Sequence, residues 1–380
     1  DTSSGASSYG SFQVHNITSG ATQTVMAWNH PWVSGLNYPD IGIGGYLGSV
    51  QTDWTFSSSA SLGGTSAAGF KMQVLVGGSP TLTINAGSGA VSVTGATSGL
   101  KSFTVNSNAA TSTISGVISG AYNITKTGAG TLVLTGANTY GATTISAGVL
   151  QVGAGGTVGT LGAGNVTNNA TLTFNRSDDF TYDKVISGSG ALIKNAANTI
   201  TLTGANTYTG ATTINAGQLV IERDTLTFAT SGFTGAGTLV VQSAAANFAA
   251  PYTFNATISN LGGLTIGKSG NTTAVTLSGA ININGKLLVN APTTLGADVT
   301  TGGTQEYTGN VTVSVSSVSL STTNKSITFG GDINGAAANT NSLFLLSGSG
   351  AINVSGSVGN TYALNYFGLG GTGQYQAAST

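Results

Sequence analysis

Short runs in which apolar and small polar residues alternate recur along most of the chain. Two examples are Thr131-Leu132-Val133-Leu134 and Val149-Leu150-Gln151-Val152, and corners rich in Gly or Asn separate such runs. Alternation with a period of two, bounded by turn residues, is typical of short strands that turn one face toward a core. No window has a convincing 3.6-residue period, and the helix formers Glu, Lys and Arg are scarce. The pattern therefore predicts an all-β chain with very little helix.

A long repeat connects these runs. The stretch 117–152 aligns with the stretch 185–221 at an offset of 68 residues, without a gap as far as Tyr140 on Tyr208, after which Thr209 is an insertion. The text LTGANTY occurs in both copies, and fainter echoes continue toward residue 350. Strands this short can close as coils of a solenoid in which each coil hydrogen-bonds to the next at about 4.8 Å. One repeat would then be about three coils of ~20–25 residues.

The predicted fold class is a right-handed parallel β-helix (β-solenoid) with a distinct N-terminal β-rich module. A sandwich or barrel is the rival interpretation, and it would place neighbouring strands antiparallel in hairpins. The solenoid is favoured because segments far apart in the chain resemble one another, which a sandwich does not require.

Three ranges differ in composition. Residues 1–100 hold all three tryptophans and both histidines, 101–360 hold the repeats, and 361–380 form a Gly-rich tail. Solenoid ends leave unpaired strands, so we expect the first range to be a cap or assembly module and the last to be an assembly segment. Aromatic residues there could form a module core or a subunit interface. The residues considered for subunit contacts are Trp28, Trp32, Tyr38, Tyr46, Trp54, Tyr366 and Phe367.

Composition limits the partners and the chemistry that the chain can have. Gly accounts for 59 of 380 residues, charged residues for 6%, and ten Lys and Arg stand against eleven Asp and Glu. No basic stripe is present to neutralise phosphates, so we expect no nucleic-acid partner. The lack of Cys removes disulfides and thiol chemistry. No run approaches 18 apolar residues, so we expect no membrane-spanning helix, and a start at Asp1 fits a mature chain without its signal peptide.

The repeated text resembles a known family, the passenger-associated repeats of bacterial autotransporters. Lys126 to Val152 and Lys194 to Ile221 match its pattern of a Lys, a Gly-x-Gly-Thr-Leu stretch, LTGANTYTG and TTINAG before an apolar strand. The resemblance implies a β-helical stalk, secreted by or displayed on a Gram-negative-type bacterium. The chain departs from the family in showing no C-terminal membrane β-barrel. We therefore expect a trimmed passenger or, preferably, a free-standing protein built on the same repeat.

Candidate chemistry is sparse in this sequence. A serine hydrolase needs a His base, and His15 and His30 are the two available. Paired carboxylates could serve a glycosidase, but only Asp178, Asp179 and Asp183 cluster along the chain. We interpret this cluster as a loop held by local hydrogen bonds and ion pairs, and we expect no enzyme activity and no cofactor. Calcium bound by these three carboxylates is the one metal site considered.

Three functions stay open at this point. The first is a structural subunit that assembles with copies of itself into a surface layer or filament, with cell-surface polysaccharide as a further partner. Low charge and unpaired solenoid ends favour it. The second is an adhesin or autotransporter passenger fragment that binds host or glycan ligands. The third is a polysaccharide-degrading enzyme, which ranks last because the clustered carboxylates belong to the common repeat text.

Overall fold

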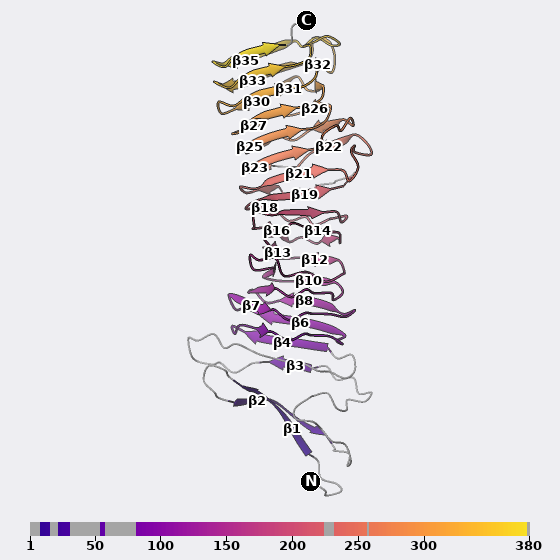
Figure 1. Ribbon diagram of the computed structural model, residues 1–380, viewed down its shortest axis with the longest axis vertical. Coiled ribbons are helices and arrows are strands. Elements are labelled where there is room, and N and C mark those ends of the chain that lie inside the picture. The colour runs from indigo at the N-terminus through magenta and orange to yellow at the C-terminus, as the bar shows by residue number, and fades with distance from the viewer. Residues whose placement is uncertain are drawn as a thin grey trace. The chain divides into compact units, whose positions relative to one another are not determined.

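A computed structural model describes residues 8–15, 22–30, 54–57, 81–223, 232–256 and 258–377. Every regular element in these ranges is a β-strand, so none of their segments is a helix that could cross a membrane. All but two of these strands pair in parallel, as in a β-solenoid of about 14 turns, which confirms the predicted all-β solenoid (Figure 1). The rival sandwich is wrong, because coil pairs with coil in parallel rather than through antiparallel hairpins.

The chain divides into two compact units, Asp1–Arg176 with Ile186–Gly190 and Ser177–Val185 with Ala191–Thr380. Unit 1 contains two parallel sheets and the antiparallel pair β1 (Ser8–His15) and β2 (Thr22–His30). The first sheet runs through β3 (Trp54–Ser57), β4 (Thr81–Gly87), β6 (Ser102–Ser107), β8 (Asn123–Thr127), β10 (Thr143–Ile145), β12 (Val166–Asn168) and β15 (Ile186–Ser187). The second runs through β5 (Ser92–Val93), β7 (Thr111–Ile114), β9 (Thr131–Leu134), β11 (Val149–Val152) and β13 (Thr171–Phe174).

Unit 2 is built in the same way from parallel ladders. One sheet consists of β22 (Tyr252–Phe254), β24 (Val275–Leu277), β26 (Thr293–Leu295), β29 (Val311–Val313) and β32 (Ile333–Gly335). The other strands up to β25 are β14 (Phe180–Tyr182), β16 (Ala191–Lys194), β17 (Thr199–Leu202), β18 (Thr212–Ile214), β19 (Gln218–Glu222), β20 (Phe233–Thr234), β21 (Thr238–Gln242), β23 (Ile258–Ile266) and β25 (Ile281–Val289). The remaining ones are β27 (Val299–Thr301), β28 (Gln305–Tyr307), β30 (Ser317–Thr322), β31 (Ile327–Phe329), β33 (Ser342–Gly348), β34 (Ile352–Val354), β35 (Tyr366–Gly371) and β36 (Tyr375–Ala377).

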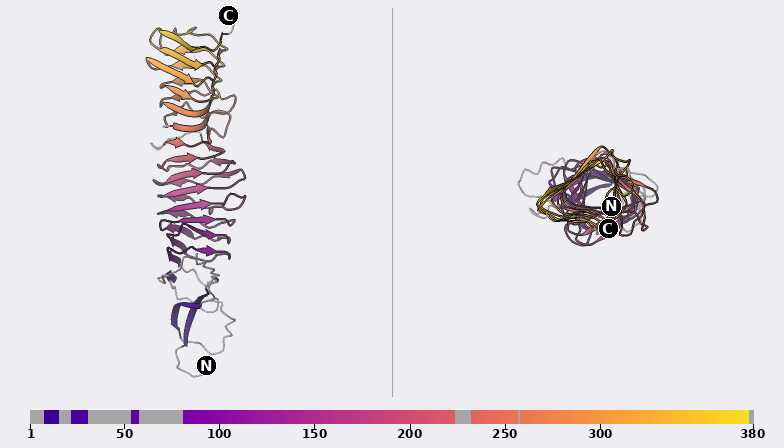
Figure 2. Two further views of the ribbon diagram at one scale, coloured as in Figure 1. Left: turned by 90° about the vertical axis from the view of Figure 1, so that its left-hand side faces the viewer. Right: turned by 90° about the horizontal axis from the view of Figure 1, so that it is seen from above.

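The strand register measures the length of a coil. From β4 onward, a residue pairs with a residue of the next coil that lies 18 to 25 positions later in the sequence. Leu287 and Gln305 give the shortest separation, and Ser317 and Ser342 give the longest. A coil is therefore close to the length expected from the repeat. Figure 2 shows the strands of each unit lying one above another in successive coils.

Alternate residues of each strand fill the interior. In β6, Phe103 and Val105 are buried, whereas Ser102 and Thr104 are partly exposed. Inward residues of successive coils stack into columns, as Ile124 of β8 does on Phe103. Each fully buried aliphatic or aromatic side chain stabilises the folded chain by about 1.5–3 kcal/mol. The core is thus a set of apolar columns along the solenoid, and the outward residues of the same strands take no part in it.

Parallel pairing extends into both terminal ranges that differ in composition. β4 and β5, inside 1–100, pair with β6 and β7. β35 and β36, inside 361–380, pair with β33 and β34. The assignment of these ranges as cap and assembly segments stays a prediction.

Candidate functional site

Two lysines lie in the core of the solenoid, one in each copy of the repeat. Lys126 of β8 shares an inward column with Val105 and Ile145, and Lys194 of β16 pairs with Ile214. Both residues are buried, with 0% and 1% of their surface exposed. An ammonium group taken out of water is tolerated only where hydrogen bonds compensate it. The neighbours of each Nζ atom therefore determine what these lysines do.

Lys126 Nζ donates to three backbone carbonyl oxygens. Those of Thr127 and Gly128 lie at 2.7 Å and belong to its own coil, and that of Ala147 lies at 3.3 Å in the following coil. Burial lowers the pKa of the Lys126 ammonium. We call this arrangement, a buried lysine bonded to carbonyl oxygens of two successive coils, the lysine clip.

Lys194 forms the second lysine clip. Its Nζ atom donates to Ala196 O at 2.6 Å, to Asn198 Oδ1 at 3.1 Å and, in the following coil, to Ala216 O at 2.9 Å. Burial lowers the pKa of Lys194 to about 8, and the negative charge of Asp179 acts in the opposite direction. The two copies of the repeat therefore build the same bond between coils.

A glycine follows the inter-coil acceptor in each clip. Gly148 and Gly217 have φ angles of 67° and 66°, in the left-handed region that favours glycine. A Cβ atom at Gly148 would also lie 2.4 Å from the carbonyl oxygen of Gly130. The lysine and the Ala-Gly pair of the repeat therefore act together: alanine supplies the acceptor for the lysine, and glycine allows the turn that follows it.

The text LTGANTY also serves coil stacking. In unit 1, Asn138 is buried, its Oδ1 atom accepts from the amide of Ile118 at 2.9 Å, and its Nδ2 atom donates to Thr160 O at 2.7 Å. The amide side chain thus connects three successive coils. Tyr140 is fully buried and its hydroxyl contacts that of Thr143 at 3.0 Å, and burial raises the pKa of Tyr140 to about 12.

Outward residues of the strands form polar columns. In unit 1, one column of the first sheet includes five threonines in register on successive coils, Thr83, Thr104, Thr125, Thr144 and Thr167. Side-chain hydrogen bonds join outward residues beside it, as from Asn106 to Asn85 at 3.1 Å. These columns present hydroxyl and amide groups with no charge among them.

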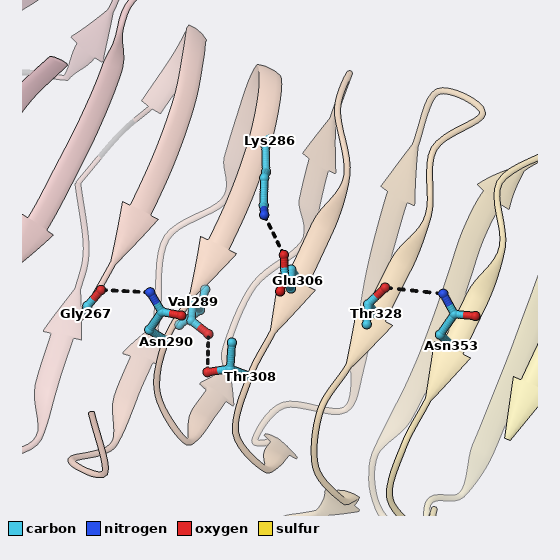
Figure 3. A network of polar contacts seen from close by, with 8 residues as sticks. All are labelled: Gly267, Lys286, Val289, Asn290, Glu306, Thr308, Thr328 and Asn353. Atoms are coloured by element: carbon cyan, nitrogen blue, oxygen red, sulfur yellow. Dashed lines mark hydrogen bonds and ion pairs between the residues drawn. The ribbon is translucent and has the colours of Figure 1, made fainter. Parts of the chain in front are cut away.

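Unit 2 has polar outward residues as well, and Figure 3 shows part of this surface. Lys286 forms an ion pair with Glu306 of the next coil, and Asn353 donates to Thr328 at 3.5 Å. Both members of the ion pair are exposed, so it stabilises the fold by at most about 1 kcal/mol. These contacts follow the coil-to-coil register and form no enclosed site.

The structure separates the carboxylates considered for calcium. Asp179 Oδ1 accepts a hydrogen bond from the amide of Thr199 at 2.6 Å. Asp178 offers its backbone carbonyl oxygen to Asn198 Nδ2 at 2.5 Å. Both contacts reach the next coil, so this turn is tied to its neighbour.

Asp183 follows β14 and forms an exposed ion pair with Lys184 at 2.9 Å. The hydrogen bond from Lys184 lowers the pKa of the Asp183 carboxyl. Across the part of the chain that the structure describes, no three His, Cys, Asp or Glu residues gather in a way that could hold a metal ion. Hydrogen bonds to the next coil therefore hold Asp178 and Asp179, an ion pair engages Asp183, and calcium binding by these residues stays a prediction.

The aromatic residues considered for subunit contacts are only partly described. Trp28 lies in β2 and Trp54 in β3, and the two histidines end β1 and β2. Trp32, Tyr38 and Tyr46 lie outside the described residues. Near the other end, Tyr366 and Phe367 are neighbours in β35.

Tyr366 and Phe367 point to opposite faces of their strand. Phe367 pairs with Leu343, which is buried, and therefore lies in an inward column. Tyr366 lies outward and is 55% exposed. Of the two residues, Tyr366 is the more exposed.

Comparison with known proteins identifies the repeat. The family model of the passenger-associated-transport-repeat matches residues 124–152 and 192–221. An autotransporter named adhesin BmaC, from Brucella suis biovar 1 (strain 1330), is 40% identical over 82 residues. That match covers 22% of this chain and 2% of the adhesin, so the chain spans a very small part of this relative's length. No solved structure matches the chain.

Proposed function

We propose that this chain, which carries two autotransporter passenger repeats, is part of a passenger displayed on the surface of a Gram-negative bacterium and acts there as an adhesive stalk. The observation that supports this most is the match of both repeats, whose shared lysines and Ala-Gly pairs fasten coil to coil. The relative in Brucella suis carries the name of an adhesin.

The use of the repeated residues supports a binding role rather than catalysis. Lys126, Lys194, Asn138 and Tyr140 are engaged in the core or between coils, so the shared text holds the scaffold together. Specific recognition then belongs to the outward residues, which can change without disturbing the core. We infer that different passengers of this type present different outer faces on one kind of scaffold.

The self-assembling layer or filament has less support than the adhesive stalk. Both comparisons lead to passenger proteins, and neither leads to a layer or filament protein. Copies of the chain and cell-surface polysaccharide stay proposed partners. Ordered arrays of the purified chain in cryo-electron microscopy would favour assembly over adhesion.

Adhesion is tested with the purified full chain on polystyrene beads. Coated beads are expected to attach to cultured epithelial cells in larger numbers than beads coated with the heat-unfolded chain, because recognition needs the folded outer faces. Albumin-coated beads measure the background. Attachment at the background level, or equal attachment of the folded and unfolded chains, contradicts the adhesive role.

A further inference from the structure

Exposed apolar side chains gather near residues 346–375. Of the eight large hydrophobic residues that are exposed among those described, five lie there: Leu346, Tyr362, Tyr366, Leu369 and Tyr375. A contiguous exposed apolar patch on an otherwise polar surface is a sign of an interaction site. The strand register shows which of these side chains share one outer face.

Three neighbouring strands, β30, β33 and β35, form that face. Their inward residues Val318, Leu320, Leu343 and Leu345 are fully buried, so the residues that alternate with them point outward. The outward residues form three rows of three, namely Ser317, Ser319 and Ser321, then Ser342, Phe344 and Leu346, then Tyr366, Gly368 and Gly370. We call Phe344, Leu346, Tyr366, Gly368 and Gly370 the aromatic platform.

The two rings of the platform lie over glycine. The ring centroids of Phe344 and Tyr366 are 5.3 Å apart, with 34° between the ring planes. A Cβ atom at Gly368 would lie 2.7 Å from Tyr366 Cε1 and 2.9 Å from Phe344 Cδ1, and Gly368 is buried under them. One at Gly370 would lie 2.6 Å from Leu346 Cδ2. The side chains therefore lie along the sheet, as aromatics do over strand glycines.

The surroundings of the platform are polar but nearly uncharged. Residues 333–380 contain no Asp, Glu, Lys, Arg or His. On the neighbouring coils, the hydroxyls of Ser321 and Thr300 lie 3.0 Å apart. The amide of Ser319 donates to the exposed Asp298 at 2.8 Å. The rim thus offers hydroxyl groups and one carboxylate around an apolar centre.

We propose that the aromatic platform binds the sugar rings of a neutral polysaccharide. A pyranose has faces of C–H groups, which carry partial positive charge and stack on the negative face of an aromatic ring, and hydroxyls at its edge. Phe344 and Tyr366 supply the ring faces, and the serine row supplies hydrogen-bond partners for the hydroxyls. This inference rests on the proposed adhesive function and names the class of its ligand.

The composition of the face favours a neutral sugar over an anionic partner. An acidic glycan or an anionic lipid surface would be drawn by lysines or arginines, which residues 333–380 lack. A row of serines on the neighbouring strand borders the platform, which suits an extended chain lying across it.

The test uses the purified full chain on an array that carries neutral host-type glycans, neutral bacterial exopolysaccharides, and sulfated and sialylated glycans. Binding to at least one neutral polysaccharide is expected. Phe344→Leu and Tyr366→Leu keep an apolar side chain but remove the ring, and each is expected to weaken that binding by about tenfold. Tyr362→Leu is the matched control, because Tyr362 is 48% exposed but lies outside the three strands. Its binding should be unchanged.

Several results would overturn this inference. Binding only to sulfated or sialylated glycans, binding to none, or equal affinity of the three leucine variants each contradicts it. Circular dichroism and the thermal unfolding midpoint confirm that a variant is folded. Surface display is measured separately on intact cells, so a chain that binds neutral glycans without being displayed would refute the proposed function and leave the platform intact.

Discussion

Lys194 Nζ lies 2.9 Å from the carbonyl oxygen of Ala216, a residue of the following coil. The equivalent bond in the first copy of the repeat joins Lys126 to Ala147 at 3.3 Å. A solenoid depends on contacts between neighbouring coils for its stability. These two buried hydrogen bonds therefore stabilise the contact between neighbouring coils, on which the fold depends.

Replacement of a clip lysine should lower the stability of the solenoid. Lys194→Ala leaves a cavity and unsatisfied carbonyl oxygens, and we expect it to lower the free energy of unfolding by about 3 kcal/mol. Lys194→Met should cost less, because it fills the volume and removes a buried charge. Urea unfolding followed by circular dichroism measures both. Lys286→Ala is the control, since the exposed pair with Glu306 contributes at most about 1 kcal/mol. An Ala variant as stable as the wild type would refute the clip.

The lowered pKa of Lys194 predicts a pH dependence. The pKa is about 8 in the folded chain and 10.5 for an ordinary lysine, so the unfolded chain binds this proton more tightly. The contribution of Lys194 to stability is therefore lowest below pH 8 and rises between pH 8 and 10.5. We expect the difference in urea midpoint between wild type and Lys194→Met to shift in favour of the wild type across this window. If the urea midpoints of the two proteins change with pH in the same way, the predicted shift is contradicted.

Gly148 should not tolerate a side chain. Gly148→Ala forces alanine into a left-handed conformation and brings its Cβ atom within 2.4 Å of Gly130 O, so we expect a loss of about 2 kcal/mol or more in the free energy of unfolding. Gly156→Ala is the matched control, because a Cβ atom there meets nothing within 4 Å. Urea midpoints compare the two variants. Equal stability of both would show that the turn does not require glycine.

Loss of the hydroxyl should change the free energy of unfolding in opposite directions at two buried tyrosines. The Tyr252 hydroxyl is buried and has no hydrogen-bond partner among the described residues, whereas the Tyr140 hydroxyl contacts Thr143. Tyr252→Phe should raise the free energy of unfolding by about 1 kcal/mol, since an unsatisfied buried group is costly, and Tyr140→Phe should lower it by about 1 kcal/mol. Thermal and urea unfolding measure both changes. A decrease for Tyr252→Phe would reveal a partner for that hydroxyl.

Local alternation was enough to predict individual strands. The runs 131–134 and 149–152 are strands β9 and β11 with the same bounds. The 68-residue offset predicted about three coils, because strands in register must repeat with the coil length. The same alternation carried an unused signal: Lys126 lies two positions from Ile124 and so shares its inward face. A lysine is usually assigned to solvent, so the sequence pattern alone does not indicate the lysine clips.

Other features depend on contacts that sequence spacing does not specify. Asp178, Asp179 and Asp183 are close in sequence, but a strand lies between the pair and Asp183, and Asp179 contacts the next coil whereas Asp183 contacts Lys184. Phe344 and Leu346 belong to the continuous apolar run LFLL, in which alternation cannot tell the outward residues from the inward ones. Only the register with β30 and β35 places them on one face with Tyr366.

Labelling of intact bacteria measures surface display directly. Antibodies raised against the purified chain are applied to living cells and to cells whose outer membrane has been permeabilised. We expect equal labelling of both, and loss of the label when a protease is added outside intact cells. Labelling that appears only after permeabilisation would contradict a displayed passenger.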